Sequence, residues 1–182
     1  MEKVILEWQG PVGIGNAVTF GEYEFRSRPH IYIFQQEFPE VSRTVVYVGK
    51  ANNLEKRVFG NAGHILSFLS LCYNLRDRNS EVLYRPSNQE YFEALESIDK
   101  FLPIALENTR RLKFFYARCD QKKLLDVEAP LTRRFREDLT DSYICDNART
   151  ERAKTELNIQ HVTKDSNVQA ALEGLIDISL DT

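Results

Sequence analysis

Two tyrosines and two basic side chains lie close together in the first third of the chain. Tyr32 belongs to one short β-rich run, and Tyr47 belongs to the next and is followed by Lys50 and Arg57. A phenol beside positive charges loses its proton more easily, because the charges stabilise the phenolate, and it can then act as a general base. A guanidinium can hold phosphate oxygens with two parallel hydrogen bonds. These four residues therefore indicate chemistry on a phosphate group.

The surrounding residues predict the elements that would hold such a site. Runs of β-branched and aromatic residues predict two strands, over 31–34 and 44–48, joined by a hairpin loop. We expect Asn52 or Asn53 to cap a helix over 54–59. Pairing of the strands would place the two phenols close together. The strand-to-helix turn would bring the two basic residues to the same edge.

A third strand and another helix are predicted further along. The strand is expected over 112–117, and Asp120 is expected to cap the helix that follows it. Pro130 falls inside this helical pattern and should kink the helix or mark the start of a second one. The expected fold class is α/β (α+β), with a small antiparallel or mixed sheet of about three strands flanked by helices.

The composition indicates one ordinary globular unit of 182 residues, 42% of them hydrophobic and 28% charged. No apolar run reaches the roughly 18–20 residues of a membrane span, and the first residues do not resemble a secretion signal. The three cysteines lack the paired spacing of a metal knuckle. We therefore expect a cytoplasmic protein without a membrane partner. The expected organisation is a domain over 1–147, with core segments 29–59 and 110–147 and a helical insertion over 60–109, and an acidic C-terminal extension over 148–182.

The order of these motifs resembles the GIY-YIG endonuclease family. The first motif is His30-Ile31-Tyr32, and the second is Tyr47-Val48-Gly49-Lys50-Ala51-Asn52-Asn53-Leu54-Glu55-Lys56-Arg57-Val58. The second motif is similar to the nuclease domain of the bacterial nucleotide-excision-repair incision protein. Glu128-Ala129-Pro130-Leu131, after the third predicted strand, matches the family's Glu-x-x-Leu, and Asn147 maps to a family asparagine. The resemblance covers about 29–147.

The sequence departs from the family pattern at several places. His30 stands where the family usually has glycine, and the gap between the two tyrosine motifs is longer than usual. Asn61 occupies the place of a family histidine, and His64 is the nearest candidate for that role. The insertion over 60–109 is longer than a minimal domain needs, so target recognition could have been added there.

The resemblance implies a metal-dependent DNA endonuclease that hydrolyses phosphodiester bonds. Glu128 would hold one Mg²⁺ (or Mn²⁺) whose other ligands are waters, Tyr32 or Tyr47 would orient or deprotonate the attacking water, and Arg57 would bind the scissile phosphate. The implied catalytic set is Tyr32, Tyr47, Arg57, His64 and Glu128. This hypothesis requires the Glu128 carboxylate to lie on the same side of the sheet as the two phenol rings.

Charge is distributed unevenly along the chain, although the net charge is only −3. Residues 110–136 carry a net charge of +6, and residues 137–182 carry −6. A basic segment favours a local polyanion site, and it is equally typical of a solvated helix surface. We expect phosphate contacts from Lys50, Arg57, Arg133, Arg134, Arg136 and Asn147, which give affinity without reading bases.

Several roles remain open within and beyond this interpretation. A restriction-type enzyme would cut a fixed short sequence, whereas a repair or structure-selective nuclease would cut damaged or branched DNA. An enzyme that cuts both strands would act as a homodimer, with the apolar patch over 170–178 as a candidate seam. The non-enzyme alternative is a binding module for nucleic acid or protein that keeps the fold without cutting. An unrelated α/β scaffold with a chance motif is the third alternative.

Overall fold

The computed structural model describes residues 1–12, 28–59, 73–85, 95–137, 139–147 and 152–181. At its centre is the predicted hairpin, formed by β2 (His30–Phe38) and β3 (Arg43–Ala51). β2 is buried on both faces, which explains the apolar run over 31–34 within it. β6 (Leu112–Arg118), the predicted third strand, pairs with the other edge of β2. The three predicted strands are thus confirmed, and they are adjacent.

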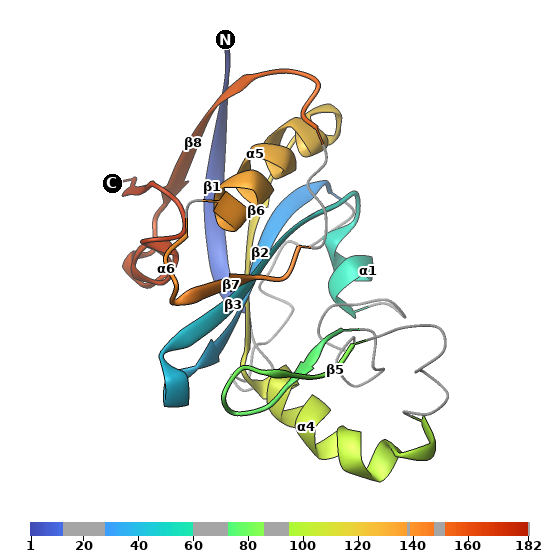
Figure 1. The fold of residues 1–182 in the computed structure, drawn as a ribbon. Coiled ribbons are helices and arrows are strands. Elements are labelled where there is room, and N and C mark those ends of the chain that lie inside the picture. Colours follow the sequence, from blue (N-terminus) through green and yellow to red (C-terminus); the bar gives the residue numbers. More distant parts are fainter. Residues whose placement is uncertain (13–27, 60–72, 86–94, 138, 148–151, 182) are drawn as a thin grey trace.

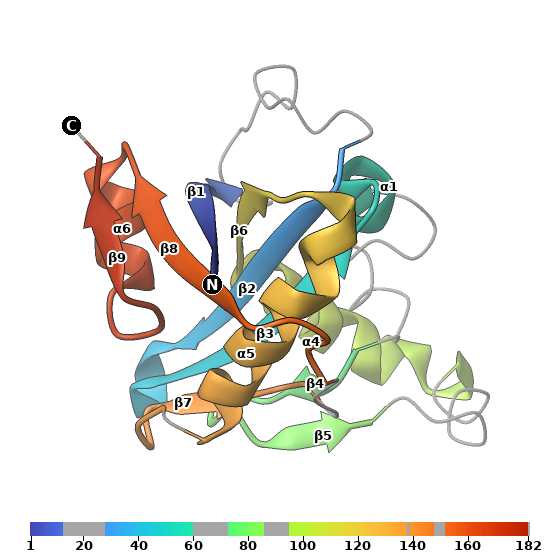
Figure 2. The same ribbon diagram turned by 90° about the horizontal axis from the view of Figure 1, so that it is seen from above.

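The expectation of about three strands is wrong, because these strands belong to a sheet of seven. The order is β7-β3-β2-β6-β1-β8-β9 (Figures 1 and 2). The additional strands are β1 (Glu2–Val12), β7 (Tyr143–Cys145), β8 (Leu157–Thr163) and β9 (Ile178–Leu180). β1 alternates between buried and exposed residues, as a strand with one solvated face does. The fold is a mixed α/β arrangement.

Helices cover both faces of the sheet (Figure 2). α5 (Leu124–Glu137) and α6 (Ser166–Leu172) pack against one face, where Ile31, Ile33 and Val48 are buried. α1 (Leu54–Phe59), α4 (Ile98–Arg110) and the hairpin of β4 (Leu75–Arg76) and β5 (Val82–Tyr84) lie against the other. That second face carries Tyr32 and Phe34. Pro130 lies inside α5, which continues through it as one helix. These two packing layers are called the α5 face and the α4 face below.

Segments outside the predicted core are tied to the sheet. The predicted C-terminal extension supplies β8, α6 and β9, and β8 pairs in parallel with β1. In the patch over 170–178, the candidate dimer seam, the side chains of Leu172, Leu175 and Ile176 are buried in the core. Within the insertion, the buried guanidinium of Arg76 pairs with Asp146 at 2.8 Å.

Among the described residues, no helix combines the length and the apolar character that crossing a membrane requires.

Candidate functional site

The two tyrosines and Arg57 form one cluster on the α4 face. Asn53 is one of the two residues predicted to cap α1. Its side chain accepts a 2.9 Å hydrogen bond from the Lys56 backbone N–H. Arg57, in the next position, donates from Nε to the Tyr32 hydroxyl at 3.3 Å. The rings of Tyr32 and Tyr47 are nearly parallel, with centroids 6.2 Å apart. The predicted meeting of these three side chains is therefore confirmed.

Gly49 makes room for the Tyr32 ring. The two residues are directly opposite in the β2–β3 pairing. A Cβ atom added to Gly49 would lie 2.2 Å from both Cζ and the hydroxyl oxygen of Tyr32. Any other residue at this position would therefore displace the phenol from Arg57.

Burial determines the protonation of this cluster. It raises the pKa of the Tyr32 phenol well above its ordinary value of 10, the neighbouring Tyr47 raises it further, and Arg57 opposes the shift only in part. Burial would by itself lower the pKa of Arg57, but its interactions with the two tyrosines outweigh burial and raise it. Tyr32 consequently keeps its proton at neutral pH, so its hydroxyl accepts the bond from Arg57 and does not act as a base.

Glu128 belongs to a second cluster, on the α5 face. It lies on α5, and its Oε2 accepts a hydrogen bond from the Lys50 ammonium. Lys50 precedes the last residue of β3 and follows Gly49 directly, so strand alternation turns its side chain away from Tyr32. The expectation that Glu128 lies on the same side of the sheet as the rings is therefore wrong. The predicted residues form two clusters that meet at the Gly49–Lys50 peptide.

The carboxylate of Glu128 can serve as a single metal ligand. Within the described ranges, no group of three or more His, Cys, Asp or Glu side chains is arranged to hold a metal ion. Mg²⁺ is commonly bound through one or two carboxylates, with waters and substrate phosphates completing its shell. Glu128 fits that mode once Lys50, whose side chain is 30% exposed, has turned away from it.

Asn147 holds the strand on which the site is built. Its carboxamide accepts a 2.9 Å hydrogen bond from the Val48 N–H and donates a 2.7 Å bond to the Val48 carbonyl. It thereby continues the β3–β7 pairing, which ends at Val46 and Cys145. The predicted phosphate contact of Asn147 competes with this structural role, because both carboxamide groups already bond the backbone between Tyr47 and Gly49.

The predicted arginine cluster lies at the other end of α5 from Lys50. Arg133, Arg134 and Arg136 are exposed there, one to two turns beyond Glu128. Arg134 is near enough to His161 of β8 to help lower its pKa, after burial. These arginines thus lie near the β7 and β8 strands and away from the two clusters. His64 and Asn61 fall outside the described residues.

A lysine-lined cavity beside the second cluster was not predicted. It has a volume of about 450 Å³ and is lined by Lys50, Gln121, Lys122 and Lys154, among others. The predicted cap at Asp120 could have located Lys122, because Asp120 begins the turn that carries Lys122 at the end of β6. Lys154 lay beyond sequence reasoning. Its backbone is held here because Asp126, buried in α5, accepts a hydrogen bond from the Lys154 N–H at 2.5 Å.

Comparisons of this chain with protein-family models, with curated proteins and with solved structures give no match.

Proposed function

We propose that the protein is a metal-dependent DNA endonuclease of the GIY-YIG type. The observation that carries the proposal is the Tyr32–Tyr47–Arg57 cluster, packed over Gly49 and adjoining the Lys50–Glu128 pair. The proposal departs from the sequence-based hypothesis in one respect: Glu128 lies across the sheet from the phenols, so the two clusters would meet a DNA strand only at the end of β3, where Gly49 and Lys50 are adjacent.

Each side chain has a task in phosphodiester hydrolysis. Arg57 binds a non-bridging oxygen of the scissile phosphate and stabilises the charge that develops on it. Tyr32, protonated and completely buried, holds the Arg57 guanidinium in position by accepting its hydrogen bond. Tyr47 is left as the tyrosine that orients or deprotonates the attacking water. Glu128 would anchor Mg²⁺, which supplies charge neutralisation and an acidified water when bound, and Lys50, released from Glu128, contacts the phosphate.

Plasmid cleavage tests this proposal. Supercoiled plasmid in Mg²⁺ should be nicked or linearised by the wild-type protein, and cleavage should fall at least 100-fold in Arg57→Ala and Glu128→Gln, as for the loss of a charge-stabilising group. Glu137→Gln is the matched control, because Glu137 is an exposed carboxylate at the end of the same helix. Absence of cleavage on varied DNA substrates, or equal cleavage by Glu128→Gln and Glu137→Gln, would contradict the proposal.

A nucleic-acid-binding module without nuclease activity is the second candidate. One observation favours it: the Lys50 ammonium holds Glu128, on the face opposite the phenols. In that case DNA binding persists in EDTA, and Tyr47→Phe binds DNA as the wild type does, with no cleavage under any metal condition.

The biological role is a finer proposal. Two roles are open for such a nuclease: a restriction-type enzyme, which we favour, and a repair or structure-selective nuclease. Sequencing of the cut ends distinguishes the two, since a restriction enzyme gives one short consensus and a structure-selective nuclease gives none. Sedimentation with and without DNA would show whether double-strand cutting requires a homodimer.

A further inference from the structure

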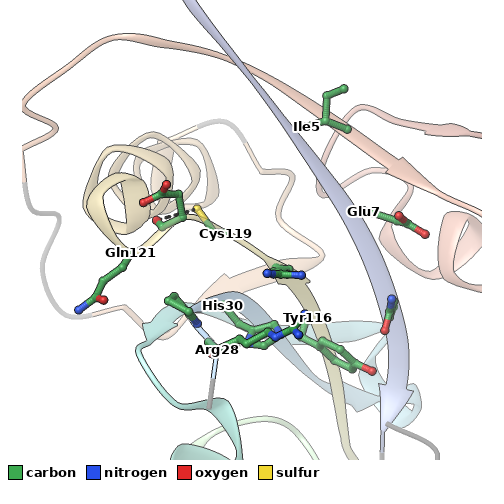
Figure 3. A pocket seen from close by; sticks show the side chains of 11 residues that line it. Ile5, Glu7, Arg28, His30, Tyr116, Cys119 and Gln121 are labelled. Atoms are coloured by element: carbon green, nitrogen blue, oxygen red, sulfur yellow. Dashed lines mark hydrogen bonds between the residues drawn. The ribbon is translucent and has the colours of Figure 1, made fainter. Parts of the chain in front are cut away.

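A large polar cavity opens on the α4 face, at the end of the sheet where β2 begins (Figure 3). Its volume is about 710 Å³. It is lined by side chains from three strands and from the segments flanking them, including Glu7, Gln9, Arg28, His30, Arg118 and Gln121. Its size lies within the range of small-ligand sites.

Two arginines and two acids line this cavity, and of these four side chains the two acidic ones have a partner among the described residues. Arg28 and Arg118 are exposed, and neither forms a salt bridge with any described residue. Of the two acids that line the cavity, Glu7 pairs with Lys164 at 3.5 Å. Asp120 caps the following turn by accepting from the Lys122 N–H at 2.8 Å. Glu7 is therefore balanced by a lysine and Asp120 is directed at the turn, and the two arginines are available to an anion.

His30 lies between the two arginines, because it is opposite Arg118 in the β2–β6 pairing and its ring bonds the backbone of Arg28. Burial lowers the pKa of His30, the hydrogen bond to the Arg28 carbonyl opposes this in part, and the charges of Arg118 and Arg28 lower it further. The ring is neutral at pH 7. Its Nδ1 lies 2.7 Å from the Arg28 carbonyl oxygen, which can only accept, so Nδ1 carries the proton. His30 thereby fixes the backbone of Arg28 at the rim without adding charge.

The cavity adjoins the proposed catalytic cluster. Tyr116, which also lines it, is directly opposite Tyr32 in the β2–β6 pairing. His30 pairs with Arg118 on one side and with Ala51, the last residue of β3, on the other. Gln121 lines both this cavity and the lysine-lined one. Basic groups thus continue around the end of the sheet from the arginines to the lysines.

We propose that the Arg28–Arg118 cavity is a phosphate subsite for the DNA strand, next to the scissile position and outside the catalytic set. The proposal rests on the nucleic-acid substrate of the proposed function. A backbone phosphate bound there fixes how the strand crosses the end of the sheet. Such contacts supply affinity and register and carry no base sequence.

DNA binding by the full chain in EDTA tests the subsite without cleavage. Fluorescence anisotropy with a labelled duplex, at several salt concentrations, should give weaker binding for Arg118→Gln and Arg28→Gln. Each variant should also lower the slope of log affinity against log salt by about 1, because one phosphate contact is lost. Arg110→Gln, at the exposed end of α4 and beside the opposite end of β6, is the matched control and should bind as the wild type does.

Cleavage kinetics separate this subsite from the catalytic residues. Arg118→Gln should raise KM several-fold and leave kcat unchanged, since a contact made equally in the ground and transition states is lost. If DNA binding depends on the two arginines but no cleavage occurs, the subsite stands and the nuclease proposal fails. If the protein cuts DNA and Arg118→Gln and Arg28→Gln both behave like Arg110→Gln, the subsite alone is overturned. Absence of DNA binding by the wild type overturns it as well.

Discussion

The two clusters at the end of β3 are held in contrasting ways. Tyr32 is completely buried, stacked on Phe114 at 5.1 Å between ring centroids, and Tyr47 is stacked on Phe34 at 5.0 Å. The side chains of Lys50 and Glu128 are instead 30% and 14% exposed and are held by their opposite charges. The aromatic cluster is therefore fixed by packing, and the ionic cluster is fixed by a contact that a ligand can exchange.

This difference fits the separate roles that we propose for the two clusters in hydrolysis. Donors that stabilise a developing charge are most effective when they are already in place, because no reorganisation is needed during the reaction. A metal ligand must be able to release its previous partner. If the proposal is right, substitutions in the aromatic cluster damage both stability and activity, whereas substitutions in the ionic cluster damage activity almost alone.

Gly49→Ala should have the largest effect on stability. The added methyl would fall 2.2 Å from the Tyr32 hydroxyl, and the ring is confined by Phe114 and Tyr47. We expect a loss of about 3 kcal/mol in the free energy of unfolding, as for severe overpacking, together with loss of cleavage. Urea unfolding measures the first, and plasmid cleavage the second.

A double-mutant cycle provides the control for Gly49→Ala. In a Tyr32→Ala background the clash is gone, so Gly49→Ala should then cost less than about 1 kcal/mol. Equal costs in both backgrounds would mean that the Gly49–Tyr32 contact does not explain the glycine.

Asn147 comes next, because it holds the strand segment shared by both clusters. Asn147→Leu leaves the N–H and carbonyl of Val48 without their side-chain partner and should cost about 2 kcal/mol. Asn147→Asp keeps the acceptor for the Val48 N–H and loses only the donor, so it should be intermediate. Thermal unfolding compares the three proteins. If Asn147→Asp were as stable as the wild type, the donor contact to Val48 would contribute nothing.

The hairpin, α1 and β6 could be predicted because their signals are local. β-branched and aromatic runs mark the strands, and Asn53 marks the start of α1. β1 alternates just as clearly, through Val4, Leu6 and Trp8, but it was not among the predicted strands. β8 is mostly polar and acquires its place by pairing in parallel with β1, about 150 residues away. No local pattern encodes that pairing.

The division of the site between two faces was readable and was missed. Successive side chains of a strand point to opposite faces, so Tyr47 and Gly49 must share one face and Lys50 must take the other. The Leu-rich side of α5 then needed a face with aliphatic residues, and Val46 and Val48 provide it. The order of the family motifs predicted that the phenols, Arg57 and Glu128 converge, whereas the alternation of side chains along β3 argued against this. The arginine cavity escaped prediction because Arg28, Arg118 and Gln9 meet only through sheet pairing.

Glu128→Gln should change stability much less than the aromatic substitutions. Partly exposed ion pairs contribute about 1 kcal/mol or less, and glutamine still accepts a hydrogen bond from Lys50. Urea unfolding at low and high salt should show a small difference from the wild type that decreases as salt screens the pair. A loss of more than about 3 kcal/mol, typical of a broken buried ion pair, would mean that the ionic cluster is structural and would remove the contrast between the faces.

The smallest effect concerns pH, and it compares the faces through one histidine on each, the buried His30 and the half-buried His161. Burial lowers the pKa of His161, on the α5 face, to about 4, and it also lowers that of His30 on the α4 face. Between the unfolded value near 6.5 and these folded values, the unfolded chain binds more protons. Stability is therefore complete above pH 6.5 and is lost as the pH falls toward 4. Each histidine should lower the free energy of unfolding by less than about 1 kcal/mol when the pH falls from 7 to 6.

Trp8 can follow this loss, because it is the only tryptophan and its Nε1 donates to His161 Nδ1 at 3.0 Å. Urea unfolding monitored by Trp8 fluorescence at pH 7 and pH 6 should show a smaller decrease in stability for His161→Gln than for the wild type, and the same should hold for His30→Gln. The glutamine oxygen can keep the bond from Trp8, so the variant removes the proton uptake without removing the acceptor. An unchanged pH dependence in His161→Gln would place the acid sensitivity outside the α5 face. Since the raised pKa of Tyr32 leaves that phenol protonated throughout this range, a fall in cleavage that tracks the stability loss would report unfolding and not titration of the aromatic cluster.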